Sequence, residues 1–208
     1  MNQRFKHGNQ VRIIAGQWRG RRLHFPDLPG LRPTPDRVRE TLFNWLAPIV
    51  PGARCLDLFA GSGALGVEAL SRGATDVVFV EQHPAAFKAL RANLMQLGAR
   101  NARVDCAEAL AWLRQPGTPF EIVLLDPPFG GNLLEPVCAA LQQNGWLTPT
   151  AWIYLETETH LQPVLPPDWT VHREKTAGAV TYRLVRREDP LFSSNQAIWQ
   201  QAATADEE

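Results

Sequence analysis

Long hydrophobic runs are missing from this sequence. No stretch of about 18 apolar residues, the length that a membrane-spanning helix needs, occurs in the chain of 208 residues. The N-terminus also lacks the basic segment followed by an apolar one that marks a signal peptide. We therefore expect a soluble, cytoplasmic protein without a membrane partner.

Patterns typical of metal sites and disulfides are missing as well. The three cysteines, Cys55, Cys106 and Cys138, are far apart and form no CxxC pair. They lie in apolar surroundings, so we expect buried, reduced thiols. The five histidines show no ligand spacing. The sequence therefore predicts no metal site.

An excess of one charge is also lacking, because 21 basic side chains balance 21 acidic ones. Their distribution along the chain is nevertheless uneven. Residues 1–40 hold nine basic and three acidic side chains, a net charge of +6, and the rest of the chain therefore carries −6. A basic N-terminal segment on an acidic body favours a polyanionic partner such as nucleic acid. The alternative is a solvated pair of surface strands.

Glycine and proline divide the N-terminal region into a hairpin and a helix. The runs 11–16 and 21–26 flank GQWRG and predict a β-hairpin. Thr34 is expected to cap the following helix, with Pro35 at its first position. The apolar side chains of this helix fall on one face, at Val38, Leu42, Trp45 and Ile49.

Strands and helices alternate through the rest of the chain. Apolar runs predict strands at 53–59, 77–81, 102–106, 120–126, 151–156, 169–175 and 179–187. Helices are expected at 63–73, 84–98, 107–113 and 133–145. Such alternation predicts an α/β, Rossmann-like fold, in which a mostly parallel seven-stranded sheet has helices on both faces. We divide the chain into a basic extension with a hairpin (1–33), a main domain (34–188) and a polar tail (189–208) that is expected to be disordered.

A glycine-rich loop follows the first strand of the sheet. Gly61, Gly63 and Gly66 satisfy GxGxxG between a strand and a helix, and Glu81 ends the next strand. The glycines let a ligand approach the backbone, and the carboxylate can accept hydrogen bonds from two ribose hydroxyls. The pattern predicts a nucleoside-containing cofactor, and NAD(P) fits it as well as others do. A tight turn that requires glycine is the purely structural alternative.

Asp57 favours a cationic cofactor. It stands at the end of the first strand, where the pyrophosphate of a dinucleotide would meet a fixed carboxylate. S-adenosylmethionine offers an amino group, a sulfonium and a ribose instead. Glu108 opens a helix after the third strand. It could meet the adenine amino group, or it could be an ordinary solvated glutamate in a first helical turn.

The fourth strand runs into the sequence IVLLDPPFGG, at 122–131. Two consecutive prolines fix φ at about −65° and end the strand. Asp126 could therefore be a solvated strand end, or it could form a rigid pocket with the carbonyl of Pro127 and the ring of Phe129. A carboxylate and a carbonyl that accept both N–H groups of an exocyclic amine would turn its nitrogen towards sp³ geometry, as methyl transfer requires. If the first and fourth strands are neighbours, this pocket faces the glycine loop.

These motifs together resemble a known family. DLFAGSGALG with IVLLDPPF looks like a class I S-adenosylmethionine-dependent amino-methyltransferase. IIAGQWRGRRL, LRPTPDRVRETLFNWL and DLFAGSGALGVEALSRGA resemble, more closely, the bacterial 16S ribosomal RNA guanine-N2 methyltransferases. The similarity extends over about residues 11–186. It implies a substrate within an assembling small ribosomal subunit, namely 16S rRNA. We expect the protein itself to be a monomer.

The resemblance also implies roles for particular residues. S-adenosylmethionine would be surrounded by Asp57, Phe59, Gly61 and Gly63, with Glu81 on its ribose and Glu108 on its adenine amine. The target base would lie in a catalytic pocket made by Asp126, Pro127, Pro128 and Phe129. RNA is expected to contact Arg19, Arg21, Arg22, Arg37 and Arg39, although Arg37 or Arg39 could instead meet the cofactor carboxylate. Trp18 could stack on RNA or pack against the body.

Three other functions fit parts of the sequence. An adenine-N6 methyltransferase acting on DNA or RNA would share DPPF and differ in the methylated base. An NAD(P)-linked oxidoreductase would explain the glycine loop and Glu81 but neither Asp57 nor DPPF. A non-catalytic RNA-binding module would not need an intact DPPF.

Overall fold

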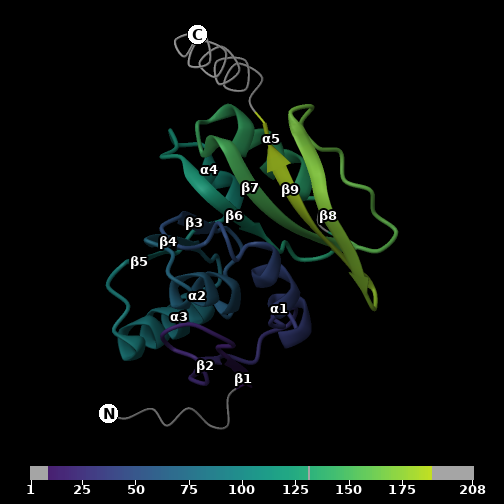
Figure 1. The fold of residues 1–208 in the computed structure, drawn as a ribbon. Coiled ribbons are helices and arrows are strands. Elements are labelled where there is room, and N and C mark those ends of the chain that lie inside the picture. The colour runs from purple at the N-terminus through teal and green to yellow at the C-terminus, as the bar shows by residue number, and fades with distance from the viewer. Residues whose placement is uncertain (1–8, 131, 189–208) are drawn as a thin grey trace, which may run out of the picture.

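The computed structural model describes residues 9–130 and 132–188 (Figure 1). The predicted tail at 189–208 and the first eight residues of the N-terminal extension lie outside the described residues. A seven-stranded sheet with the order β5-β4-β3-β6-β7-β9-β8 forms the centre of the molecule. Its strands are β3 (Arg54–Asp57), β4 (Asp76–Val80), β5 (Ala102–Asp105), β6 (Phe120–Leu125), β7 (Leu147–Glu158), β8 (Trp169–Ala177) and β9 (Val180–Arg187). β9 runs opposite to the other six strands of this sheet, which confirms the predicted mostly parallel sheet.

Helices cover both faces of the sheet, as predicted. On one face lie α1 (Asp36–Trp45), α2 (Ala64–Ser71) and α3 (Pro84–Leu97), and on the other lie α4 (Ala109–Leu113) and α5 (Leu134–Gln143) (Figure 1). Each face has its own hydrophobic core. Leu42, Val67 and Leu90 belong to the first, and Leu113 and Val137 belong to the second. The sheet is thus buried on both sides, as the continuous apolar strands predicted.

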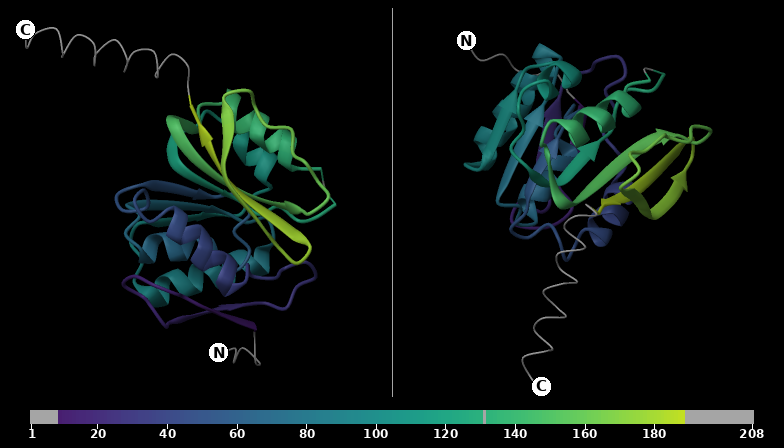
Figure 2. Two further views of the ribbon diagram at one scale, coloured as in Figure 1. Left: turned by 45° about the vertical axis from the view of Figure 1, so that its right-hand side comes forward. Right: turned by 90° about the horizontal axis from the view of Figure 1, so that it is seen from above.

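The predicted hairpin consists of β1 (Asn9–Arg12) and β2 (Arg22–Phe25), which pair in antiparallel fashion. It lies beside α3 and away from β8 and β9 (Figure 2). Asn93 of α3 accepts a hydrogen bond from His24 N at 3.1 Å and donates one to His24 O at 2.8 Å. Trp18 packs against the first core, and its backbone N–H donates to Ser71 Oγ. The structure thus agrees with the expectation that Trp18 packs against the body of the protein.

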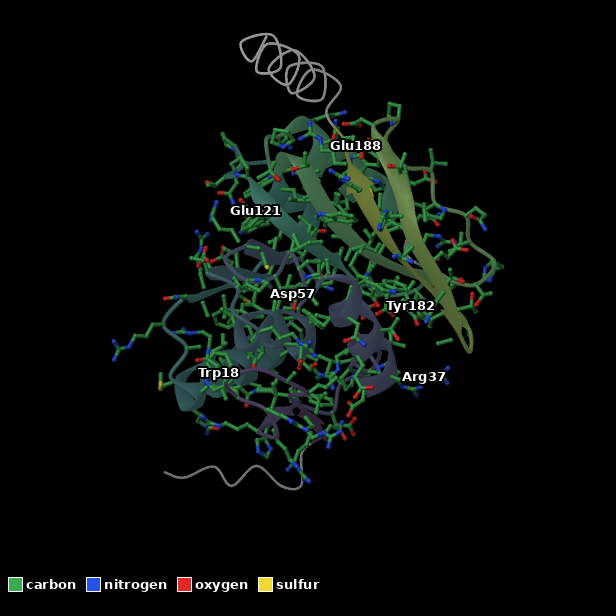
Figure 3. The ribbon with its side chains drawn as sticks, viewed as in Figure 1. Trp18, Arg37, Asp57, Glu121, Tyr182 and Glu188 are labelled. Atoms are coloured by element: carbon green, nitrogen blue, oxygen red, sulfur yellow. The ribbon has the colours of Figure 1, made fainter. Side chains whose placement is uncertain are left out.

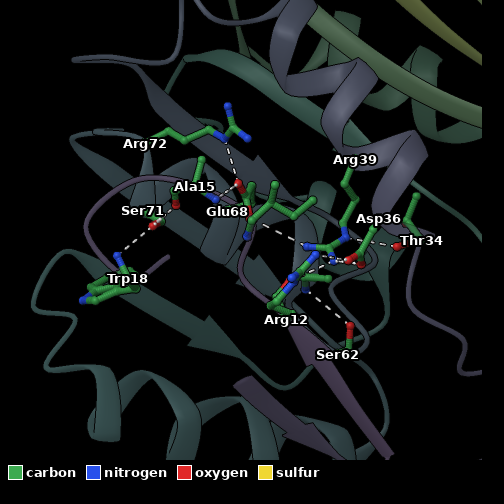
Figure 4. Close-up of polar contacts among 12 residues, drawn as sticks. Arg12, Ala15, Trp18, Thr34, Asp36, Arg39, Ser62, Glu68, Ser71 and Arg72 are labelled. Atoms are coloured by element: carbon green, nitrogen blue, oxygen red, sulfur yellow. Dashed lines mark hydrogen bonds and ion pairs between the residues drawn. The ribbon is translucent and has the colours of Figure 1, made fainter. Parts of the chain in front are cut away.

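A buried carboxylate attaches the hairpin to the helices (Figure 4). Glu68 of α2 is fully buried and accepts hydrogen bonds from Ile14 N at 2.8 Å and Ala15 N at 3.0 Å. Arg72 donates to the same carboxylate at 2.8 Å, and a guanidinium nitrogen of Arg39 lies 3.7 Å from it. The hairpin is therefore held by charged and backbone groups as well as by apolar packing.

Two local predictions are wrong. The N-cap of α1 is Pro35, and no side chain caps this helix; the Thr34 hydroxyl donates across the molecule to Asp126 Oδ2 at 3.3 Å. Cys55 and Cys138 are buried, but Cys106 is exposed. The reason is that the chain leaves β5, an edge strand of the sheet, at the preceding Asp105.

Candidate active site

The glycine loop and the DPPF segment meet at the carboxyl edge of the sheet. β3 pairs with β6 in parallel, and Asp57 lies opposite Leu124, two residues before Asp126. Leu58 N donates to Leu124 O at 3.2 Å. The predicted contact between the first and fourth strands is therefore confirmed, and it brings the two motifs to one place.

Glu81 organises the glycine loop. Its carboxylate is 8% exposed and accepts hydrogen bonds from Gly61 N at 2.7 Å and from His83 N at 2.6 Å. Gly61 and Gly63 have φ of +51° and +77°, which favours glycine. A Cβ on Gly63 would lie 2.3 Å from Leu90 Cδ1. Glu81, which directly follows β4, thus contacts the glycine loop, as its spacing from the loop in the sequence suggested.

Asp57 lies under this loop, near the middle of the molecule (Figure 3). Its side chain is 2% exposed, and Oδ2 accepts a hydrogen bond from Gly66 N at 2.9 Å. Burial raises the pKa of Asp57 to about 7; the Gly66 N–H opposes this rise and the charge of Glu81 adds to it. A cationic group brought to this site would favour the ionised form.

Two other predicted cofactor residues are Phe59, in the glycine loop region after β3, and Glu108, at the start of α4. Phe59 is half-buried and packs against the second core. Glu108 is exposed and caps α4, where its carboxylate accepts hydrogen bonds from Leu110 N at 3.0 Å and Ala111 N at 2.7 Å. Its contact with adenine stays a prediction, and the structure gives this side chain a helix-capping role in any case.

The DPPF residues follow β6 directly. Asp126 is half-buried, and burial raises the pKa of this carboxyl well above its usual range. The charges of Glu156 and Asp57 add to the rise, and the hydrogen bond from Thr34 opposes it. An acid whose pKa is raised in this way is typical of a functional site.

Beside Asp126 lies a cavity of about 260 Å³. Pro127, Pro128 and Phe129 form one wall, and Glu156 and Leu161 contribute to the rest. Phe129 is 51% exposed and Leu161 is 40% exposed. Pockets for drug-sized ligands measure about 300–1,000 Å³, so this cavity suits a single planar base.

Sequence reasoning missed Glu156 and its neighbours. Glu156 on β7 is 5% exposed, and Tyr154 Oη donates to its Oε1 at 2.6 Å. Burial raises the pKa of Glu156, and the hydroxyls of Tyr154 and Thr34 partly offset this rise. The available signal was an acid that ends the apolar run AWIYLE, at the same place in its strand as Asp126.

Four of the five predicted RNA-binding arginines are exposed, namely Arg19, Arg21, Arg22 and Arg37. Figure 3 shows Arg37 at the outer edge of the molecule. Arg39 contradicts the prediction, because it is 1% exposed. Its guanidinium donates to Thr34 O, Arg12 O and Asp36 Oδ1. The buried face of α1 includes position 39, so this arginine joins the hairpin to α1 and presents no surface to RNA.

Two negative findings concern the described part of the chain. None of its His, Cys, Asp and Glu side chains form a group of three or more that could hold a metal ion. None of its helices is long and apolar enough to cross a membrane.

The sheet order, the glycine loop after β3 and the DPPF segment after β6 define a class I methyltransferase fold. The chain belongs to the family described as Conserved hypothetical protein 95, which matches residues 11–186.

Relatives of known name agree with this membership. The chain is 56% identical to Ribosomal RNA small subunit methyltransferase D of Escherichia coli K12 over 180 residues, 86% of this chain and 91% of that protein. It is 49% identical to the protein of the same name from Haemophilus influenzae over 179 residues, 84% of this chain and 93% of that protein. The solved structure of the yhhF protein of Escherichia coli matches with a TM-score of 0.80 at 55% identity, covering 86% of this chain and 99% of that one. The predicted family is confirmed, and the oxidoreductase alternative is not favoured.

Proposed function

We propose that this protein transfers a methyl group from S-adenosylmethionine to the exocyclic N2 amine of a guanine in 16S rRNA of the small ribosomal subunit. The observation that carries the proposal is the pairing of β3 with β6, which places the glycine loop and Asp126 at one edge of the sheet. The name of the Escherichia coli relative, Ribosomal RNA small subunit methyltransferase D, supports the substrate class.

The residues at this edge fit S-adenosylmethionine. A buried carboxylate, Glu81, already accepts hydrogen bonds beside a glycine loop, and ribose hydroxyls suit such an acceptor. Asp57 supplies negative charge for a cationic ligand. The full set that we assign to the cofactor is Asp57, Phe59, Gly61, Gly63, Glu81 and Glu108. When bound, S-adenosylmethionine supplies an electrophilic methyl group on a sulfonium.

The DPPF residues prepare the amine. The lone pair of an exocyclic purine amine is delocalised into the ring, so the nitrogen must be turned towards sp³ geometry before it attacks. We assign the two hydrogen-bond acceptors to the carboxylate of Asp126 and the carbonyl of Pro127. Pro128 keeps the turn rigid and Phe129 stacks on the base. As the N–C bond forms and the S–C bond breaks, N2 loses a proton, and the raised pKa of Asp126 suits this group to receive it.

The target base must leave its stack to reach this pocket, which costs a few kcal/mol. We assign the RNA backbone to the exposed arginines of the N-terminal region: Arg19, Arg21, Arg22 and Arg37. Phosphate contacts of this kind position the substrate without reading its sequence.

The experiment that tests the proposal uses small subunits purified from cells that lack the enzyme. They are incubated with tritiated S-adenosylmethionine and the protein, and the RNA is digested to nucleosides. We expect the label in N2-methylguanosine of 16S rRNA. Label in N6-methyladenosine would support the adenine alternative and contradict the proposal, as would the absence of any transfer.

A further inference from the structure

A second carboxylate, Glu156, lines the cavity that begins at Pro127, next to Asp126. β6 and β7 pair in parallel, with Leu125 opposite Leu155. Asp126, the residue directly after β6, is therefore beside Glu156 of β7, and Glu156 lines the cavity together with Pro127 and Phe129. A base held against Phe129 with its amine at Asp126 would therefore have Glu156 within the same small space.

Tyr154 orients this second carboxylate. The Tyr154 hydroxyl is buried, and it donates to Glu156 Oε1 at 2.6 Å. The Thr34 hydroxyl donates to Asp126 Oδ2 at 3.3 Å. Each of the two acids thus has a hydroxyl donor of its own, and Tyr154 fixes the orientation of Glu156.

The placement of these acids is unfavourable for the folded protein. Asp126 is repelled by Glu156 and by Asp57, and burying a carboxylate away from water costs free energy unless it is compensated. An amide at position 156 would accept the Tyr154 hydrogen bond without that repulsion. A negative acceptor at this position therefore points to a ligand that donates a hydrogen bond there.

Guanine has a suitable donor. Its N1–H lies next to the N2 amine on the Watson–Crick edge, so the edge presents two neighbouring donors. Adenine presents an unprotonated N1 acceptor next to its N6 amine. Enzymes that flip a base read this edge by hydrogen bonds.

We infer that Glu156 determines the specificity for guanine by accepting the N1–H of the target base while Asp126 holds its N2 amine. The inference rests on the proposed function and adds a residue that reads the base without taking part in bond formation. A site built to bind an N–H group rejects an analogue that lacks it, because a buried acceptor is left without its donor.

The test uses 2-aminopurine, which keeps the 2-amine of guanine but has no hydrogen on N1. Small subunits are reconstituted with ligated 16S rRNA that carries either guanine or 2-aminopurine at the methylated position. The ratio of kcat/KM for the two substrates is then measured. We expect wild type to prefer guanine by about 10- to 100-fold, the factor that a hydrogen bond to a charged group is worth.

The variant Glu156→Gln supplies the opposite pattern. Tyr154 holds the oxygen of the introduced amide, so its NH₂ group faces the base and suits the N1 acceptor of 2-aminopurine. We expect the preference for guanine to fall by about tenfold or more. Glu40→Gln is the control, because this exposed acid of α1 does not line the cavity, and its preference for guanine should stay at the wild-type value.

The outcomes separate this inference from the proposed function. Methylation of a base other than guanine would overturn the proposed function. Methylation of guanine N2 with equal kcat/KM for 2-aminopurine would overturn the inference alone, and this needs only the wild-type protein. If Glu156→Gln melts at the wild-type temperature but lowers both rates in equal proportion, Glu156 only supports the pocket, and the inference is wrong.

Discussion

Asp57 shows how a single side chain links the site to the stability of the fold. Its carboxylate is 2% exposed and is used by the backbone of α2. Burial raises its pKa from 3.8 to about 7. The folded protein therefore binds a proton at Asp57 over a range of pH in which the unfolded chain has released it.

This shift predicts a pH dependence of stability. Because the folded pKa is raised, the contribution of Asp57 is fully present below pH 3.8 and is lost as the pH rises through about 7. We expect the free energy of unfolding of wild type, relative to Asp57→Asn, to fall by about 3 kcal/mol between pH of about 4 and about 7. Urea denaturation of both proteins without cofactor measures this difference, and a difference that does not change with pH would contradict the assignment.

Arginine side chains illustrate what a sequence cannot distinguish at this scale. Arg37 and Arg39 are two residues apart on one helix, yet Arg37 is exposed and Arg39 is 1% exposed. The difference depends on Glu68 and on the carbonyl of Arg12, which are distant in sequence and approach Arg39 only in the folded chain. The same applies to Thr34, whose partner Asp126 lies 92 positions along the chain.

At the scale of elements, the hairpin depends on one buried acid of α2. Glu68 accepts two backbone N–H groups of the hairpin and pairs with Arg39 and Arg72. Removing one member of a buried charge network leaves the others uncompensated. We expect Glu68→Ala to lower the free energy of unfolding by about 3–5 kcal/mol.

Chemical denaturation tests this prediction. Glu40→Ala, which removes an exposed acid from α1, is the control and should stay within about 0.5 kcal/mol of wild type. Equal stability of the two variants would show that the hairpin is held by apolar packing alone.

The outer face of the hairpin should bind RNA phosphates. Arg19, Arg21 and Arg22 are exposed, and within the described part of the chain Arg21 and Arg22 each make a single side-chain hydrogen bond to a neighbouring group on the surface, at Gln96 and Gln10 respectively. Each phosphate contact contributes about 0.7–0.9 to the slope of log affinity against log salt. Replacing all three by alanine should therefore reduce that slope by roughly 2 and leave the affinity for S-adenosylmethionine unchanged.

Binding of small subunits across a salt series gives the answer. An unchanged affinity and slope would mean that these arginines are only a solvated surface. The charge imbalance of residues 1–40 would then carry no functional information.

Most elements could be predicted from the sequence, since their patterns are local. The apolar runs of β3, β4 and β6, and the helix that begins at Pro84 and ends before Gly98, all follow from periodicity and from glycine and proline. The absence of a side-chain cap on α1 could not be predicted, because the Thr34 hydroxyl binds the carboxylate of Asp126, which is distant in sequence, and not the nearby helix backbone. The glycine loop and DPPF are recognisable sequence motifs, but Glu156 belongs to none. This acid on β7 becomes significant only once β7 is known to lie beside β6, and sequence reasoning therefore missed it.

At the scale of the whole molecule, the order of strands separates the region assigned to the cofactor from the region assigned to the target base. The residues assigned to the cofactor lie at or after the ends of β3, β4 and β5, and those assigned to the base lie after β6 and on β7. The two halves meet where β3 pairs with β6. Variants on either side should therefore separate cofactor binding from turnover.

Glu81→Ala tests the cofactor half. Loss of a charged acceptor, which also holds Gly61 N at 2.7 Å, should weaken S-adenosylmethionine binding by about 1–3 kcal/mol. Isothermal calorimetry measures this change, and methyl transfer should recover when the cofactor concentration is raised. Unchanged affinity would remove Glu81 from the cofactor site.

Asp126→Ala gives the most direct test of the central claim, that the DPPF carboxylate acts on the target amine and not on the cofactor. The measurement is the single-turnover rate of methyl transfer to small subunits at saturating S-adenosylmethionine, with the affinity for the cofactor determined on the same protein. We predict an affinity equal to that of wild type and a rate lower by about 100-fold or more, as for the removal of one oriented group that stabilises a transition state. A folded variant that transfers methyl groups at a nearly wild-type rate would contradict the account.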